Sequence, residues 1–277
     1  MRVMSHPALN IVSIGECTID DYLQQKRQFV GGISLNFAIN AKRCGADRVS
    51  LVSRIGNDRD SQILQKLVSE SIDTSHLKIV EGETARQNIV LSGQGERIFP
   101  PGGYQSGVLN GFFLNQDDLQ FVKKHDVIVC ALFKQVEPLF YQLIREITLD
   151  GWLVADFLDL ADYNYDTRIV EMNIERLKIA FISGNREMVE RLRPFSLASN
   201  CLIVITLGAE GSIALIQGEP VHQPAIPVSE VVDSTGCGDA FQAAFTVSYW
   251  LNEDPRTALE CGAHQAAKVI QRLGAIG

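Results

Sequence analysis

Short runs of apolar, β-branched residues recur along this chain, with helix-like segments between them. Several runs are almost continuously apolar, which is typical of strands that are covered on both faces. Alternating strands and helices predict an α/β fold with a mostly parallel sheet and helices on both sides. The candidate strands are Asn10–Gly15, Val49–Ser53, Val127–Leu132, Trp152–Phe157, Ile179–Ser183, Leu202–Leu207 and Ile213–Gln217.

Three of the intervening segments carry helix signals. Asp60 is a suitable N-cap for a segment with one apolar face. Pro138–Leu149 is a second candidate. A third opens at Asp254–Pro255, where an N-cap aspartate precedes a proline in the first turn, and Gly274 is positioned to end it.

Two stretches interrupt this alternation of strands and helices, at approximately residues 17–30 and 76–105. The second contains a hairpin signal, in which Asn88–Ser92 and Glu96–Phe99 flank a Gly-Gln-Gly turn. We expect both stretches to form antiparallel strands of a small lid over the strand ends, where ligands of open α/β sheets bind. Surface decoration is the alternative. The chain is thus predicted to be one domain, 1–277, with the lid segments inserted in it.

Charge and hydropathy limit the partners and the location. The chain has 277 residues, with 25 Lys and Arg against 33 Asp and Glu, so its formal charge is −8. An acidic surface repels phosphate polyanions, and we expect neither a nucleic-acid nor a membrane partner. No apolar run reaches the roughly 18 residues of a membrane span. The first 15 residues are interpreted as a first strand and not as a signal peptide.

The six cysteines are scattered along the chain and form no C-x-x-C pair. This spacing argues against a zinc site or a disulfide framework. Buried, reduced thiols are typical of a cytoplasmic protein, and cytoplasmic is the predicted location. The cysteines are Cys17, Cys44, Cys130, Cys201, Cys237 and Cys261.

The segment 231–241, VVDSTGCGDAF, is the most informative part of the chain. An apolar strand end runs into a turn of small residues, and a helix is predicted over roughly Asp239 to Leu251. Small residues at 236–238 let a ligand approach the backbone, and the free N–H groups of the helix start favour phosphate oxygens. Asp239 at the same place is suited to accept a proton from a hydroxyl that attacks the anion. An ordinary helix-capping aspartate is the alternative.

This segment resembles the C-terminal signature of the ribokinase-like, or pfkB, carbohydrate kinases, which is close to D-T-x-G-A-G-D. Ser234 and Cys237 are small deviations from it. Two further motifs resemble the family in order and spacing, namely a Gly-Gly pair followed by Asn in GGISLNFAIN and a strand with a glycine turn at 206–211. The matching residues are Gly31, Gly32, Asn36, Thr206, Gly208, Gly211, Asp233, Thr235, Gly236, Gly238 and Asp239.

The resemblance implies a three-layer α/β/α fold and an ATP-dependent phosphotransferase that uses Mg²⁺ and K⁺. It implies that Asp239 is the catalytic base and that the amides of Gly236, Cys237 and Gly238 form an anion hole. Asp233 matches a position that helps to bind a monovalent cation. The implied sugar-binding residues are Asp20, Gly32 and Asn36, and the implied nucleotide-binding residues are Asn185, Thr206, Gly208, Gly211, Ala263 and Ala266.

The chain departs from the family pattern more clearly at two further positions. Many members carry an N-x-x-E sequence that organises water on Mg²⁺, but here Asn185 is followed by Met188 at the glutamate position, with Glu187 one place earlier. Ile33 follows the Gly-Gly pair where ribokinases proper have Lys. The first departure places the organisation of the metal in question, and the second argues against ribokinase itself.

Within the family the chain looks most like the bacterial fructosamine kinases, which implies transfer to a primary hydroxyl of a sugar such as fructoselysine. Glu16, Asp20 or Asp21 could attract the substrate amine, and Asp156 is a further candidate for the pocket. Fructokinase, tagatose-phosphate-type kinase and nucleoside kinase are alternatives. For an unsubstituted phosphosugar we expect a basic residue in the pocket, such as Arg86 or Arg97.

Other classes lack their motifs in this sequence. No G-x-G-x-x-G follows the first strand, which argues against a dehydrogenase, and Walker A, H-E-x-x-H and G-x-S-x-G sequences are missing. A non-catalytic sugar or nucleotide sensor on the same fold remains as a rival, because fold does not imply function. We also expect the edges of the lid strands to offer a route to a homodimer.

Overall fold

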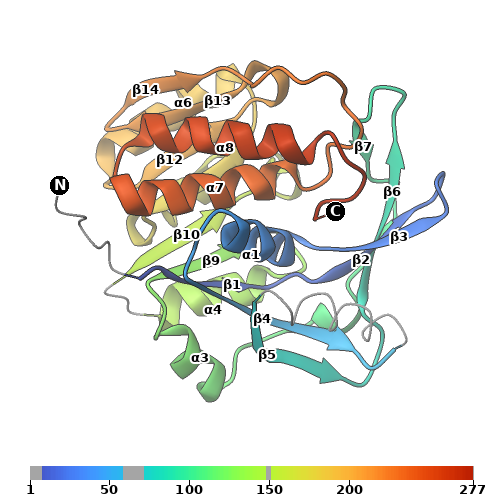
Figure 1. Ribbon diagram of the computed structural model, residues 1–277. Coiled ribbons are helices and arrows are strands. Elements are labelled where there is room, and N and C mark those ends of the chain that lie inside the picture. The colour runs from blue at the N-terminus through green and yellow to red at the C-terminus, as the bar shows by residue number, and fades with distance from the viewer. Residues whose placement is uncertain (1–7, 59–71, 148–150, 277) are drawn as a thin grey trace, which may run out of the picture.

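The computed structural model describes residues 8–58, 72–147 and 151–276, and its largest feature is a nine-stranded sheet (Figure 1). Neighbouring strands run parallel from β12 to β5, whereas β13 and β14 continue the sheet antiparallel. In spatial order the strands are β14 (Glu219–Gln223), β13 (Ser212–Ile216), β12 (Leu202–Thr206), β11 (Ile179–Ser183), β10 (Trp152–Asp156), β9 (Val127–Ala131), β1 (Asn10–Ile14), β4 (Arg48–Gly56) and β5 (Asp73–Val80).

Helices cover both faces of this sheet. The helices α1, α7 and α8 lie on one face, and α3, α4 and α6 lie on the other (Figure 1). Among the described residues, no helix is both long and apolar enough to cross a membrane. The α-helices are α1 (Ile33–Arg43), α3 (Gln116–Val122), α4 (Glu137–Glu146), α5 (Arg168–Glu171), α6 (Arg186–Ala198), α7 (Cys237–Asn252) and α8 (Pro255–Val269), and 3₁₀ turns span Gly107–Leu109, Ala161–Tyr163, Ile174–Arg176 and Gly208–Glu210.

Alternate side chains of each central strand belong to two separate cores. Ile11 of β1 packs with residues of α1, α7 and α8, whereas Val12 and Ile14 pack with residues of α3, α4 and α6. A strand buried on both faces needs apolar residues at every position, which explains the continuous apolar runs. The predicted three-layer α/β/α fold is confirmed.

A second, five-stranded sheet stands beside the large one at the right of Figure 1. Its strands are β3 (Arg27–Gly31), β2 (Thr18–Tyr22), β6 (Ala85–Leu91), β7 (Arg97–Ile98) and β8 (Tyr104–Gln105). The predicted hairpin is present as the antiparallel pair of β6 and β7. The expectation of purely antiparallel pairing was wrong, because β2 and β6, which join the two segments, pair parallel.

The second lid segment was predicted to start too early. Residues 73–80 form β5, which pairs with β4 at the edge of the large sheet. Most of its side chains are exposed or half-buried, so its polar sequence suits an edge strand that is covered on one face only. The small sheet takes its second segment from β6 onward.

The predicted helix ends were less accurate than the helices themselves. Asp254 caps α8 as expected, but the helix stops at Val269 and not at Gly274. The N–H groups of Val232 and Asp233 both donate to the carbonyl of Ile270, which binds the end of the helix to the loop before α7. The helix predicted from Asp239 begins two residues earlier, at Cys237. The segment predicted to start at Asp60 lies outside the described residues, as does the end of Pro138–Leu149.

Candidate active site

A cavity of about 490 Å³ opens between the carboxyl ends of the parallel strands and the small sheet. This is the edge at which ligands of open parallel sheets bind. Its wall contains the predicted residues Asp20, Gly32, Asn36, Gly236, Gly238 and Asp239. The structure therefore brings together residues from three distant parts of the chain.

The Gly-Gly pair holds the backbone close around Asp20 and the start of α1. A Cβ on Gly31 would overlap the Asp20 carboxylate, and a Cβ on Gly32 would lie 2.8 Å from the carbonyl oxygen of Glu16. Gly32 also has a φ of 101°, which disfavours other residues. Both glycines are thus required by close contacts with Glu16, which precedes β2, and with Asp20, which is in β2.

Helix α1 delivers Asn36 to Asp239. The Ile33 N–H donates to Glu16 Oε2 at 3.0 Å, so the glutamate binds the start of the helix. One turn later, Asn36 Nδ2 donates to Asp239 Oδ2 at 2.8 Å. This bond links α1 to α7 and orients the carboxylate that the sequence predicts to be the base.

The start of α7 offers unpaired backbone donors. Gly236 adopts a left-handed conformation, with a φ of 76°, and α7 has no side-chain cap. Within the described residues, the N–H groups of Gly236, Gly238 and Asp239 have no hydrogen-bond partner. The Cys237 N–H instead donates to Ser234 O at 3.3 Å. Of the three N–H groups in the predicted anion hole, that of Cys237 is engaged and those of Gly236 and Gly238 are free, and the anion hole itself stays a prediction.

Carboxylates dominate the wall of this cavity. Burial raises the pKa of Asp239 to about 7; the bond from Asn36 opposes this shift, and the charge of Asp156 adds to it. Burial likewise raises the pKa of Asp20 to about 7, and it raises the pKa values of Glu16 and Asp156. The lining carboxylates are Glu16, Asp20, Asp156, Asp159, Asp162 and Asp239, and Arg97 is the lone Lys or Arg beside them in the described wall.

Several buried polar atoms of the wall have no partner within the described residues. They are Asn36 Oδ1, Thr235 Oγ1 and the hydroxyls of Tyr104 and Tyr163. Leaving a buried polar atom unpaired is unfavourable, so such atoms are expected where a ligand supplies the missing bond. The two hydroxyls can donate or accept, which suits a ligand rich in hydroxyl groups.

The loop after β10 was missed by the sequence analysis. It lines the cavity from Phe157 to Tyr163, and Leu158 and Leu160 have positive φ values of 54° and 62°. Leucine rarely adopts this conformation, so no sequence pattern pointed to the turn. The Leu158 N–H donates to Asp156 Oδ1 at 2.9 Å, and this bond helps to hold the loop against the site.

The predicted nucleotide-binding residues lie outside the cavity wall. Thr206 is the nearest, because its hydroxyl donates to Oγ of Ser183, a wall residue, at 3.2 Å. Asn185 caps α6 by accepting the Met188 N–H at 3.0 Å. The others are Gly208, which begins the 3₁₀ turn after β12, Gly211, which follows that turn, and Ala263 and Ala266 on α8.

Met188, at the glutamate position of the N-x-x-E pattern, and Asp233, the predicted cation-binding residue, both have structural roles. Met188, in the first turn of α6, is buried in the core, whereas Glu187 is exposed to solvent. Asp233 is fully buried and accepts bonds from the Tyr22 hydroxyl at 2.5 Å and from the N–H groups of Thr235 and Gly274, both at 2.8 Å. Asp233 therefore anchors the loop that precedes α7.

In the described part of the chain, no three His, Cys, Asp or Glu side chains are arranged so that they could hold a metal ion. Mg²⁺ at nucleotide sites does not need such a cage of protein ligands. The ion keeps several waters there and is bound mainly through the phosphates.

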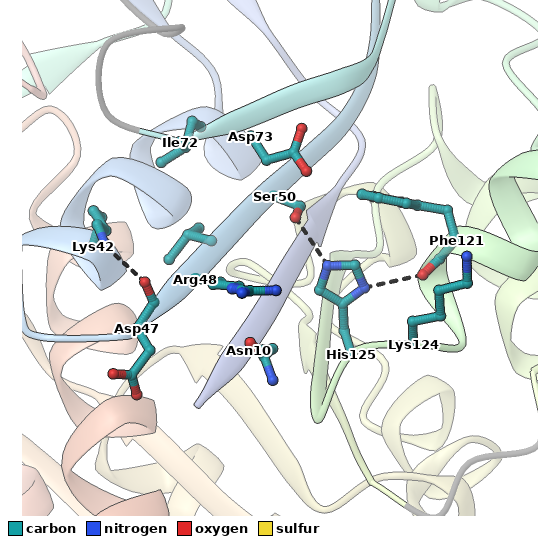
Figure 2. Close-up of a pocket in the computed structure, with 11 residues that line it drawn as sticks. Asn10, Lys42, Asp47, Arg48, Ser50, Ile72, Asp73, Phe121, Lys124 and His125 are labelled. Atoms are coloured by element: carbon teal, nitrogen blue, oxygen red, sulfur yellow. Dashed lines mark hydrogen bonds between the residues drawn. The ribbon is translucent and has the colours of Figure 1, made fainter. Parts of the chain in front are cut away.

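A second cavity, of about 540 Å³, lies at the opposite edge of the sheet, where β1, β4 and β5 begin (Figure 2). His125 lies between Ser50 Oγ, 2.9 Å from Nε2, and Phe121 O, 3.1 Å from Nδ1. Lys42 Nζ donates to the carbonyl of Asp47 at 2.7 Å. These groups are engaged with the protein itself, and we assign no function to this cavity.

Comparison with known proteins decides the family. The sequence profile of the pfkB family carbohydrate kinases matches residues 8–277. The chain belongs to the pfkB family. This pfkB kinase is 27% identical to "Fructosamine kinase FrlD" of Bacillus subtilis (strain 168), with 97% of this chain and 93% of the relative covered. It is 28% identical to "Fructoselysine 6-kinase" of Escherichia coli (strain K12), with 96% and 98% covered.

Solved structures share the fold of this pfkB kinase. An adenosine kinase from Sinorhizobium meliloti superposes with a TM-score of 0.79 at 20% identity, covering 98% of this chain and 96% of the other. A ribokinase from Arabidopsis thaliana, in complex with ribose and ATP, gives a TM-score of 0.74 at 19% identity, covering 98% and 95%. As a family member the protein is a phosphotransferase that acts on a small sugar with an alcohol acceptor group, and it uses ATP and a divalent metal.

Proposed function

We propose that this pfkB kinase is a fructosamine kinase, which transfers the γ-phosphoryl of ATP to the primary 6-hydroxyl of a sugar such as fructoselysine. The observation that carries the proposal is the acidic lining of the cavity. Six carboxyl groups line its described wall, and Arg97 is the one Lys or Arg there. Two relatives with fructosamine and fructoselysine in their names align over nearly their full length.

The charge distinguishes between candidate substrates. A fructosamine carries a protonated amine, which carboxylates attract, whereas the phosphate of a phosphosugar is repelled by them. Asp159 and Asp162 belong to the loop after β10, and Asp159 is exposed at the cavity mouth. These two side chains are well placed to meet an amine that extends from the sugar.

The buried residues are suited to the transfer step. Asp239 accepts the proton of the 6-hydroxyl as the sugar oxygen forms a bond to the γ-phosphorus. The bond from this phosphorus to the β–γ bridging oxygen breaks, and its electron pair leaves with ADP. Asn36 holds the Asp239 carboxylate, and the free N–H groups of Gly236, Gly238 and Asp239 bind phosphoryl oxygens where charge develops. Bound Mg²⁺ would neutralise phosphate charge.

The other predicted ligand sites stay proposals. The nucleotide would extend from Ser183 over Thr206 and the 208–211 turn toward α8, and K⁺ would bind near Asp233. Replacement of K⁺ by Na⁺ should lower the transfer rate if the cation site is real. A homodimer would form along β3, the edge strand of the small sheet, and sedimentation of the purified protein tests it.

The experiment is ADP release with Mg-ATP and K⁺, using fructoselysine, fructose and fructose 6-phosphate as matched acceptors. We expect kcat/KM for fructoselysine to exceed that for fructose by about 100-fold or more, which is the gain expected from roughly 3 kcal/mol of charge-assisted contacts. Phosphorus NMR should place the product phosphate on carbon 6. A preference for fructose or fructose 6-phosphate would contradict the proposed substrate.

A double variant tests directly whether the charge of the loop recognises the amine. Replacing both Asp159 and Asp162 by Asn should lower kcat/KM for fructoselysine about tenfold while the value for fructose changes little. Equal losses on both sugars would show that the loop does not recognise the amine. Tight sugar binding without turnover of any acceptor would favour the sensor.

A further inference from the structure

One side of the cavity is apolar, and the transfer step makes no use of it. A small cluster of buried apolar residues at the end of β9 is separate from the two cores of the large sheet, and side chains from α1, β8 and the loop after β10 pack against it. Four side chains of this group line the cavity, namely Ile33, Tyr104, Phe133 and Leu158. We call these four side chains the apolar wall.

The apolar wall has a defined geometry and an open surface. The rings of Tyr104 and Phe133 meet edge to face, with centroids 6.3 Å apart and planes at 86°. The positive φ of Leu158 belongs to the turn that brings this residue to the cavity. Ile33, Tyr104 and Leu158 are only half-buried. The apolar wall therefore presents hydrocarbon surface to whatever occupies the cavity.

The apolar wall adjoins the predicted sugar site. Ile33 is the first residue of α1, and Asn36, which bonds to Asp239, follows one turn later. Across the sheet, Phe133 follows β9, whereas Ser183, from which the nucleotide is proposed to extend, ends β11 two strands away. The apolar wall thus lies next to the proposed sugar position, on the side away from the proposed nucleotide.

Acidic side chains flank the apolar wall at the cavity mouth. Asp159 follows Leu158 directly and is exposed. Asp162 Oδ2 accepts the Lys134 N–H at 3.0 Å, so this carboxylate is bonded to the residue after Phe133. From the start of α1 to the mouth, the cavity therefore presents polar residues, then apolar surface, then negative charge.

We propose that the apolar wall is a subsite for a carbon chain on the acceptor, and that Asp159 and Asp162 bind an ammonium group at the far end of this chain. The favoured acceptors are then fructosamines of long amines that end in a second positive charge, such as those formed on the side chain of lysine or on a diamine. This inference rests on the proposed function and specifies which fructosamines the site selects.

The order of groups along the cavity matches such a molecule. The methylenes of an amine side chain have no hydrogen bond to lose, and their removal from water against apolar side chains favours binding. A bare sugar has no such chain. Plain packing beneath the small sheet is the alternative role for these four side chains. Packing alone would not distinguish between acceptors by the length of their chain.

The test is a series of acceptors that differ only in the amine. They are the fructosamines of methylamine, propylamine, pentylamine and cadaverine, assayed by ADP release with fructose as the reference. We expect KM to fall by up to about threefold for each added methylene, with kcat nearly constant, because contacts remote from the reaction stabilise ground and transition state alike. The second ammonium of the cadaverine compound should lower KM about threefold more than the pentylamine compound.

Variants of the apolar wall test its role directly. Phe133→Ala should raise KM for the pentylamine compound about tenfold and Leu158→Gly about threefold, while KM for the methylamine compound stays within about twofold. Glycine suits the positive φ of Leu158, so the second variant should keep the fold. The matched control is Phe113→Ala, since Phe113 is exposed and is not among the described residues that line the cavity.

Calorimetric titration of the same acceptors without ATP makes the comparison independent of turnover. The dissociation constants should follow the same dependence on chain length in the wild type and lose it in Phe133→Ala. The control Phe113→Ala should keep the wild-type dependence.

The possible failures are distinguishable. A KM independent of chain length, with every fructosamine still preferred to fructose, would overturn this inference and leave the proposed function intact. Equal losses by Phe133→Ala on the methylamine and pentylamine compounds would also overturn it, by assigning the apolar wall to packing. Equal KM values for the pentylamine and cadaverine compounds would overturn the role of Asp159 and Asp162 at the chain end. Preference for fructose over every fructosamine would instead contradict the proposed function itself.

Discussion

Two buried aspartates in different regions of this kinase have opposite environments. Asp118, on α3, is fully buried. Its carboxylate lies 2.8 Å from His76 Nδ1 and accepts hydrogen bonds from the Lys78 ammonium and the Asn115 N–H. Burial alone would raise its pKa, but these bonds outweigh it and the pKa lies below its usual value. Asp239, at the start of α7, has one side-chain donor, Asn36, and its pKa is raised to about 7.

The two buried carboxylates differ in the groups that surround their charge. At Asp118 the Lys78 ammonium balances the charge, and the bonds of the carboxylate to His76 and Lys78 hold α3 against β5. Around Asp239 the neighbours are other carboxylates, unpaired N–H groups and unpaired polar atoms. A bound ligand would pair such groups, and this arrangement supports the proposed role of Asp239.

The largest expected effect is on turnover. Asp239→Asn should lower kcat about 10⁴-fold or more, because the variant cannot accept the hydroxyl proton, while sugar binding stays within about threefold. Steady-state ADP release and calorimetric titration with the sugar measure the two quantities. The matched control is Asp73→Asn, a carboxylate at the opposite edge of the sheet, which should keep wild-type kcat. Substantial turnover by Asp239→Asn would remove the base from the mechanism.

The two aspartates should respond oppositely in stability. Asp118→Asn should lower the free energy of unfolding by roughly 2–3 kcal/mol, less than for a fully buried pair because Lys78 is partly exposed. For Asp239 the folded pKa of about 7 exceeds the unfolded value of 3.8, so its contribution is present below about pH 4 and lost as the pH rises to about 7. Asp239→Asn should therefore raise stability at pH 8, by about 1–3 kcal/mol.

Urea denaturation of both variants at pH 8 measures this contrast. The surface pair of Asp21 and Arg86 supplies the control, since Asp21→Asn should change the free energy of unfolding by less than about 1 kcal/mol. The comparison fails if both buried variants shift stability in the same direction.

The effect of Asn36 on the pH dependence of the rate should be smaller than the effects on turnover and stability. Because the base acts when deprotonated, kcat/KM should rise with pH to a plateau, with a midpoint near 7 and about a tenfold loss per unit below it. The bond from Asn36 favours the charged carboxylate, so Asn36→Leu should move the midpoint to higher pH. A pH–rate profile of both proteins measures the shift. An unmoved midpoint in the variant would show that Asn36 does not tune the base.

The smallest effect concerns motion. Sugar binding should close the small sheet over the cavity and exclude water from the reaction. Amide hydrogen exchange with and without sugar should show added protection in β2, β3 and the β6–β7 hairpin, and none in β5 or α3. Equal protection of the small sheet in both states would contradict closure.

The sequence by itself was enough to predict the layered fold and the main chemical motif. Continuous apolar runs predict strands buried on both faces, and the small residues at 236–238 predict a turn whose backbone is open to a ligand. These signals are local, because strand burial and turn conformation depend on a few adjacent residues. The predicted strands therefore all occur, although some helix ends and one lid boundary were misplaced.

Only the tertiary structure decided what meets at the site. The hydrogen bond of Asn36 to Asp239 and those of Ser234 to the hairpin join segments that are far apart in the chain. The loop after β10 holds Leu158 and Leu160 in a backbone conformation that leucine disfavours. The pKa of Asp239 is also a product of folding, since it depends on burial and on Asp156 and Glu16, which come from other strand ends. Long-range packing sets such contacts, and no local pattern of residues encodes them.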